Sequence, residues 1–167
     1  MGKIKNILFF CWGNSCRSPC AEYIAKGLKA SKYKEELKDV NFESAGFYNF
    51  YDYAQPETVE FIESKGIDMN DFQGQIINDK LLEKQDLILG MEDRRHIRRL
   101  KRKFSHIRDI DKKAHLLLKY AGASGDLDIE DPINLPKEDY WRLLERVAWG
   151  VEKAIEKIIK INKNELD

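Results

Sequence analysis

The sequence predicts an α/β protein: one domain over residues 1–167, with a doubly wound, four-stranded parallel sheet and helices on both of its faces. Three observations predict this class. Predicted strands alternate with predicted helices along the chain, the order that builds parallel βαβ units. The first predicted strand has its apolar residues bunched together instead of alternating, as in sheets covered on both faces. The chain has 167 residues, of which 43% are hydrophobic, enough to bury one core without disulfides.

The first predicted elements are a strand over residues 3–11 and the helix that directly follows it. Residues 7–10 are consecutive apolar side chains, which favours a buried strand. Ser18 suits the N-cap of the helix, and Pro19 suits its first position because its φ is fixed and it lacks an N–H. Apolar residues then recur at helical spacing as far as Leu28.

The middle of the chain repeats this alternation. Leu87, Ile88 and Leu89 indicate one of the strands, while proline and glycine mark where helices begin and end. The predicted segments are a strand over residues 40–45, a helix from Pro56 to about Gly66, a strand over 86–91, a charged helical stretch over 92–103, and a weaker strand over 105–110.

A long amphipathic helix is predicted over residues 137–161. Its apolar residues follow one another at spacings of three and four, which produces a single buried stripe. A coiled-coil partner could use such a stripe, but packing on the protein's own sheet is favoured because the strands need cover. In a sheet of this kind, ligands bind beyond the carboxyl ends of the strands.

The overall charge excludes several classes of partner. Twenty-nine basic residues balance 29 acidic ones, and the longest apolar run is six residues, so neither nucleic acid nor a membrane is a predicted partner. No secretory leader is recognisable, which predicts a cytoplasmic protein. Seven of the ten residues 94–103 are Arg or Lys. A solvated helix face is favoured for this basic run over a site for an acidic or phosphorylated partner.

Three cysteines fall within ten residues, at Cys11, Cys16 and Cys20. An odd, clustered set does not predict a disulfide framework. No second cysteine pair follows, and the three histidines are too widely spaced to complete a zinc site. No metal and no other cofactor is therefore predicted, and the clustered cysteines indicate a different chemical role.

Residues 11–19 form a loop suited to binding an anion. The loop leaves a buried strand and enters a helix, where backbone N–H groups and the helix dipole favour negative charge. Gly13 and Asn14 readily adopt positive φ, which turns amides inward. Arg17 supplies a planar cation for two phosphate oxygens. An anion held by this loop would lie over Cys11, and the same field favours its nucleophilic thiolate.

The loop resembles the signature of the low-molecular-weight protein tyrosine phosphatase family, Cys-x-Gly-Asn-x-Cys-Arg-Ser-Pro, and fills each of its fixed positions. The similarity extends over nearly the whole chain in the family's order. It continues through Glu43-Ser44-Ala45-Gly46, Gly66-Ile67-Asp68, Asp86-Leu87-Ile88-Leu89 with Met91, and Ile129-Glu130-Asp131-Pro132.

The resemblance implies a role for each of these residues. Cys11 would be the nucleophile that becomes a phosphocysteine, Arg17 would bind phosphoryl oxygens, and Asp131 would be the general acid that later activates water. Phosphotyrosine in proteins is the implied substrate, with inorganic phosphate or other oxyanions as product or inhibitor. The implied phosphate-binding loop comprises Trp12, Gly13, Asn14, Ser15, Cys16, Arg17 and Ser18, and the implied supporting network comprises Asn14, Ser18 and Ser44.

The sequence also predicts which residues form the wall of the pocket. Trp12, Tyr48, Phe50 and Ile133 are predicted to line the pocket, where aromatic rings could stack on a phosphotyrosine.

The sequence departs from the family pattern at several positions. Ile133 and Asn134 replace the tandem tyrosines of many members, which removes a site of regulation. Asp71 and Gly74 stand where members often carry His and Arg. Part of the usual supporting network is therefore missing or rebuilt.

Three alternatives remain open. A phosphoarginine phosphatase is one, since a hydroxyl residue, here Ser15, occupies its variable loop position. Arsenate reduction uses a similar loop but needs further cysteines, and none follows Cys20. A catalytically silent phosphate-binding module is the third. Independently of substrate, Cys16 is predicted to capture an oxidised Cys11 as a reversible disulfide.

Overall fold

A parallel four-stranded sheet lies at the centre of the protein. The structure is a computed structural model, and it describes residues 2–165. The strands pair in the order β2-β1-β3-β4, all parallel, which confirms the predicted sheet. They are β1 (Asn6–Cys11), β2 (Asn41–Gly46), β3 (Leu87–Gly90) and β4 (Ala114–Leu116).

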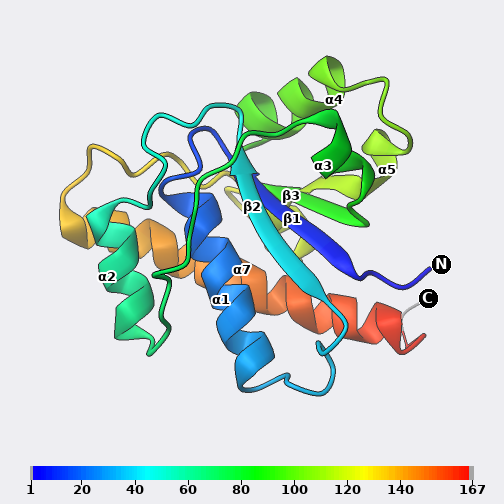
Figure 1. The fold of residues 1–167 in the computed structure, drawn as a ribbon, viewed down its shortest axis with the longest axis horizontal. Coiled ribbons are helices and arrows are strands. Elements are labelled where there is room, and N and C mark those ends of the chain that lie inside the picture. The colour runs from blue at the N-terminus through cyan, green and yellow to red at the C-terminus, as the bar shows by residue number, and fades with distance from the viewer. Residues whose placement is uncertain (1, 166–167) are drawn as a thin grey trace.

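Helices cover both faces of this sheet (Figure 1). The two longest, which follow β1 and end the chain, contact each other on one face. In chain order the helices are α1 (Arg17–Ala30), α2 (Pro56–Ser64), α3 (Asp79–Glu83), the π-helical turn η1 (Asp93–Arg98), α4 (Arg99–Lys103), α5 (Ile110–Lys113), α6 (Leu117–Tyr120) and α7 (Lys137–Asn162).

The alternation of side chains along β1 explains the two layers. Ile7 and Phe9 point into one core, which α1, α2, α6 and α7 cover. Leu8 and Phe10 point into a second core, which α3, η1, α4 and α5 cover. Because successive residues of a strand face opposite sides, the continuous apolar run of β1 is buried on both faces, and the doubly wound arrangement is confirmed.

The order of the strands places the loop after β1 at a special position. The chain passes from β1 to β2 on one side and later returns to β3 on the other side of β1. Crossovers that diverge in this way leave a crevice at the carboxyl end of the central strand. The residues after Cys11 enter that crevice.

The predicted fourth strand is wrong. Residues 105–110 form turns leading into α5, and the edge strand is β4 instead. Ile107 and Ile110 are buried at a spacing of three, which fits successive turns anchored on the core better than a strand. β4 has only three residues and merges into an apolar run with α6, so no alternation or boundary marks it.

The predicted N-cap is also wrong. α1 begins at Arg17 with Cys16 as its N-cap residue, and no side chain caps it. Ser18 lies inside the first turn, where its hydroxyl is used by the loop. The long terminal helix follows its prediction closely, since α7 spans Lys137–Asn162 and buries its apolar stripe on the sheet. Within residues 2–165, no helix combines the length and apolarity needed to cross a membrane.

Candidate active site

The loop between β1 and α1 is held tightly against the end of β2. Asn14 has φ of 50°, as predicted, whereas Gly13 does not have positive φ and that part of the prediction is wrong. Trp12 O accepts from Tyr48 N at 3.0 Å. A Cβ on Gly46 would lie 2.7 Å from Asn14 N and 2.9 Å from Trp12 O, so only glycine allows this close approach.

A cavity of about 220 Å³ opens over the loop. Cys11, Arg17 and Asp131 all line it, although Asp131 lies far from the loop in sequence. The other lining residues are Trp12, Gly13, Ser15, Cys16, Phe50, Tyr51 and Ile133. Of the predicted pocket wall, Tyr48 is not among them. Its ring instead stacks on Phe50, with centroids 5.5 Å apart, and Tyr51 takes a place at the cavity.

A chain of hydrogen bonds supports the Cys11 thiol from below. Asn14 Nδ2 donates to Ser18 Oγ at 2.8 Å and to Ser44 Oγ at 3.0 Å. Ser18 Oγ lies 3.0 Å from Cys11 Sγ. Ser18 Oγ also donates to Ala45 O at 3.4 Å, so this hydroxyl connects the thiol both to the loop and to β2. The structure thus brings Asn14, Ser18 and Ser44 together.

The network continues to a buried carboxylate that the sequence analysis did not identify. Ser44 Oγ donates to Glu22 Oε1 at 2.5 Å, and Lys26 Nζ pairs with Glu22 Oε2 at 2.6 Å. Burial raises the pKa of Glu22, against the lowering effects of Lys26 and Ser44. Lys26, one turn further along α1, supplies the cation that faces Glu22.

The two departures from the family lie beside this network. Asp71 Oδ1 accepts from Tyr23 Oη at 2.7 Å, which attaches the segment after α2 to α1. Gly74 packs so closely on Asn49 that a Cβ would lie 2.5 Å from Asn49 Oδ1. The supporting network is rebuilt without a histidine or arginine at these two positions.

Arg17 is almost completely buried, with 1% of its surface exposed. Its Nη1 donates to Glu92 Oε2 and to Ile129 O, both at 2.6 Å. Burial alone would lower the pKa of Arg17, but the negative charges of Cys11, Glu92 and Asp131 outweigh it and raise the pKa. Arg17 Nε is buried without a partner among the described residues. A buried donor of this kind suits an oxyanion in the cavity.

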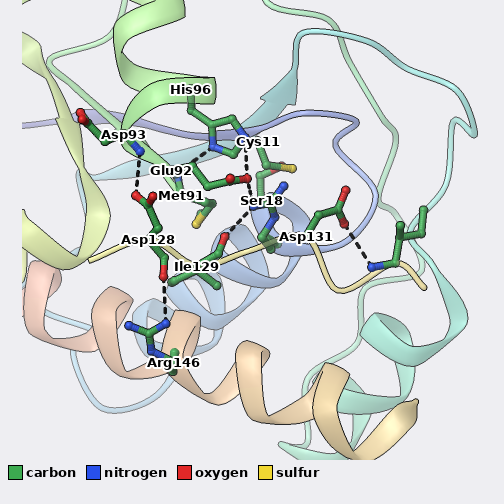
Figure 2. Close-up of polar contacts among 12 residues, drawn as sticks. Cys11, Ser18, Met91, Glu92, Asp93, His96, Asp128, Ile129, Asp131 and Arg146 are labelled. Carbon is green, nitrogen blue, oxygen red and sulfur yellow. Dashed lines mark hydrogen bonds and ion pairs between the residues drawn. The ribbon is translucent and has the colours of Figure 1, made fainter. Parts of the chain in front are cut away.

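His96 lies next to Glu92 (Figure 2). It is fully buried, and its Nδ1 accepts from Met91 N at 3.2 Å and Glu92 N at 3.0 Å. The proton of the neutral ring is therefore on Nε2, which lies 3.5 Å from Glu92 Oε2. Burial, helped by the charges of Arg17 and Arg95, lowers the pKa of His96 to about 2. His96 thus holds the start of η1 as a neutral acceptor.

Replacing His96 with glutamine is expected to change how stability depends on pH. Between pH 6.5 and about 2 the unfolded chain binds a proton that the folded chain excludes, so the free energy of unfolding falls as the pH falls. The His96→Gln variant keeps an acceptor but has no such proton. The slope of the free energy of unfolding against pH should be shallower in the variant by about 1.4 kcal/mol per pH unit at most. Denaturant titrations from pH 6.5 to 4.5 measure it, and equal slopes would contradict the expectation.

The segment that carries Asp131 is braced on both sides, as Figure 2 shows. Asp93 N donates to Asp128 Oδ1 at 2.8 Å, and Arg146 Nη1 of α7 donates to Asp128 O at 2.9 Å. Further along, Asp131 Oδ1 accepts from Ile133 N at 3.1 Å. Asp131 lies at the cavity outside any helix, as expected for the residue before Pro132.

Cys16 lies at the back of the cavity as a neutral thiol. Burial raises the pKa of Cys16 to about 12. Its backbone oxygen accepts from Thr58 Oγ1, which also lies 2.7 Å from Tyr140 Oη. Cys11, Cys16 and Cys20 are all unbridged. Among residues 2–165, no three His, Cys, Asp or Glu side chains are grouped as metal ligands.

Three residues of this site were missed by the sequence analysis: Glu22, Glu92 and His96. Glu92 had a usable signal, because it follows β3 and the carboxyl ends of parallel strands meet at one edge. His96 lies within a basic run that suggested solvent exposure, and the π-helical turn η1 directs it inward. For Glu22 no pattern in the sequence indicates the contact.

Comparisons with known proteins agree with this geometry. The family model described as "Low molecular weight phosphotyrosine protein phosphatase" matches residues 6–166. The low molecular weight phosphotyrosine protein phosphatase of Gallus gallus is 30% identical over 156 residues, covering 93% of this chain and 97% of that protein. The protein-arginine-phosphatase of Bacillus subtilis is 34% identical over 124 residues, covering 73% and 77%.

The fold of this chain is also found in a solved structure of an arginine phosphatase. A Cys-to-Ser mutant of the YwlE arginine phosphatase, with a phosphorylated active-site serine, superposes with a TM-score of 0.81 at 27% identity, over 95% of this chain and 98% of that one. Family model, curated relatives and fold all agree, and the chain belongs to the low molecular weight phosphotyrosine protein phosphatase family.

Proposed function

We propose that the protein hydrolyses phosphotyrosine in protein substrates through a phosphocysteine intermediate. The observation that carries this proposal is the meeting of Cys11, Arg17 and Asp131 around one cavity. Trp12, Phe50 and Tyr51 give that cavity an aromatic side on which a phenyl ring could stack. The phosphorylated serine in the YwlE mutant supports phosphoryl transfer to the equivalent position.

In the first step, Cys11 Sγ attacks the phosphorus atom and the bond from phosphorus to the tyrosine oxygen breaks. Asp131 gives its proton to that oxygen as it leaves. Arg17 and the loop amides stabilise the charge on the equatorial oxygens. In the second step, Asp131 takes a proton from water, which attacks phosphorus. The sulfur–phosphorus bond breaks, releasing inorganic phosphate and the Cys11 thiolate.

Parallel turnover assays with a phosphotyrosine peptide, a phosphoarginine peptide and arsenate test the proposal. Release of phosphate from the phosphotyrosine peptide is expected. Arsenate reduction with thiol as reductant would instead assign the reductase chemistry, and binding of phosphate without turnover of any substrate would assign a silent binding module.

Phosphoarginine is a second candidate substrate, favoured by Ser15. The Ser15 side chain lines the cavity, so its hydroxyl can accept a hydrogen bond from a guanidino N–H of the substrate, which phosphotyrosine lacks. The similarity to a Bacillus subtilis protein-arginine-phosphatase supports the same substrate.

The Ser15→Ile variant distinguishes the two substrates. If Ser15 recognises phosphoarginine, the substitution should lower kcat/KM for the phosphoarginine peptide about tenfold or more relative to the phosphotyrosine peptide, because a buried hydrogen bond is lost. The ratio of the two kcat/KM values is the measurement, and Ser15→Thr, which keeps the hydroxyl, is the matched control. An unchanged ratio in Ser15→Ile would exclude Ser15 as a selector of phosphoarginine.

We further propose that Cys16 protects the nucleophile from irreversible oxidation. Peroxide would convert the Cys11 thiolate to a sulfenic acid, and the Cys16 thiol would then displace water to form a disulfide. Loss of the Cys11 charge also removes one of the effects that raise the pKa of Cys16. In a cytoplasmic setting, as the sequence predicts, thiols would reverse the bridge.

The Cys16→Ala variant is accordingly expected to remain active but to recover poorly when thiol is added after peroxide. Mass spectrometry of peroxide-treated wild-type protein should find the bridge between Cys11 and Cys16. A dominant bridge to Cys20, or full recovery of Cys16→Ala, would limit Cys16 to packing.

A further inference from the structure

Two arginines of the basic run lie against the rim of the catalytic cavity. Arg95 Cζ and Arg99 Cζ lie 5.1 Å and 4.9 Å from the ring centroid of Trp12, within cation–π range. Arg99 is also 5.9 Å from the ring of Phe47. Because Trp12 lines the cavity, part of the basic run belongs to the surroundings of the active site and is not only a solvated helix face.

The charges of these two arginines are not balanced locally. Among residues 2–165, neither Arg95 nor Arg99 forms an ion pair or a side-chain hydrogen bond, whereas neighbouring Arg98 pairs with Asp93 at 2.9 Å. The positive charge of Arg95 also reaches His96, since it contributes to the lowered pKa of His96. The whole chain has a net charge of zero, so the positive charge of this segment is a local excess.

Of the residues that line the cavity, Arg17 is the cation and Asp131 is the carboxylate, while Phe50, Tyr51 and Ile133 carry no charge. The exposed fraction of Phe50 is 67%. Stacking on Trp12 restricts the two guanidinium groups, so less side-chain freedom is lost when they bind an anion. A substrate segment that crosses Trp12 on its way out of the cavity would therefore meet two partly ordered, unpaired cations.

Resting on the proposed function, we propose that Arg95 and Arg99 form a subsite for a carboxylate side chain next to the phosphorylated residue, so that the protein selects acidic phosphopeptides. Each of the two planar guanidinium groups at Trp12 can bind a carboxylate oxygen. The subsite would raise both the rate of encounter and the affinity for acidic substrates, and both effects should weaken as salt is added.

Three phosphotyrosine peptides test this subsite, identical except that the residues flanking the phosphotyrosine are Glu, Gln or Lys. At low ionic strength, kcat/KM of the wild-type protein should be about tenfold higher for the Glu peptide than for the Gln peptide, the scale of two partly exposed ion pairs. The Lys peptide should be poorer still. The preference should fall as the ionic strength rises.

The double variant Arg95→Gln/Arg99→Gln should lose this preference. The matched control is Arg102→Gln/Lys103→Gln, which removes the same charge from the same segment without touching Trp12, and it should keep the preference. A small aryl phosphate with no flanking residues reports folding and chemistry in each variant. Equal loss in both double variants would show a general charge effect and overturn the subsite, as would a wild-type protein without preference.

Binding separates this inference from the proposed function. In a Cys11→Ala background, dissociation constants for the three peptides are measured without turnover, with and without the Arg95→Gln/Arg99→Gln change. If no phosphotyrosine peptide is hydrolysed but the Glu peptide binds more tightly through Arg95 and Arg99, the subsite stands and the proposed reaction fails. If hydrolysis occurs and binding shows no Glu preference, the subsite fails alone.

Discussion

The Cys11→Ser variant should lose steady-state turnover by a factor on the order of 10⁴ to 10⁶, the range for removing a covalent nucleophile. A hydroxyl in this position is not ionised at working pH, so attack on phosphorus is slow. A phosphate ester formed there would be hydrolysed poorly, so the variant should take up at most one phosphoryl group per chain. Phosphate release under steady-state conditions measures the loss, and intact-mass spectrometry measures the uptake.

Binding of the anion should survive the same change, because Arg17 and the loop amides remain. Inorganic phosphate should therefore still raise the melting temperature of Cys11→Ser by mass action. Cys20→Ala is the control, since Cys20 is a fully buried thiol of α1 that does not line the cavity, and it should retain most of its turnover. Substantial turnover by a pure Cys11→Ser sample would refute the covalent mechanism.

The parts of the fold that the sequence predicts are those where one physical pattern dominates. β1 is apolar on both faces, and α7 has a stripe that repeats every three or four residues, so both could be placed from the sequence. β4 could not, because three residues show no periodicity and its position depends on pairing with β3. The N-cap prediction for Ser18 fails for a related reason. A serine hydroxyl can cap a helix or contact a thiol, and only the tertiary contacts decide between these two roles.

The same distinction holds for the site. Cys11 and Arg17 lie in one contiguous loop whose spacing fixes their proximity, and the family resemblance brings Asp131 to them. Glu92 contacts Arg17, and His96 contacts Glu92, from the end of a different strand, β3. Only the packing of η1 creates these contacts. Tyr48 and Tyr51 belong to one irregular segment, where no repeat decides which ring faces the cavity. Sequence patterns thus predict the residues that meet at the cavity better than the residues that position them.

Asp131→Asn should lower kcat for substrates with poor leaving groups by about 10² to 10⁴, the range for loss of a general acid. Aryl phosphates with good leaving groups should be affected less, because their oxygen departs without a proton. Asparagine keeps the oxygen that accepts from Ile133 N, so the turn should persist. Rates are compared across a series of aryl phosphates of increasing leaving-group basicity, in which the variant should show the steeper dependence.

The pH profile and a neighbouring carboxylate complete this test. For the wild-type protein, kcat/KM should fall at both ends of the pH range, and Asp131→Asn should lack the fall at high pH because the general acid has been removed. Asp128→Asn is the matched control, because Asp128 accepts from Asp93 N and does not line the cavity. It should change kcat only a few-fold. A large loss in Asp128→Asn with a nearly normal Asp131→Asn would transfer the role of the acid to Asp128.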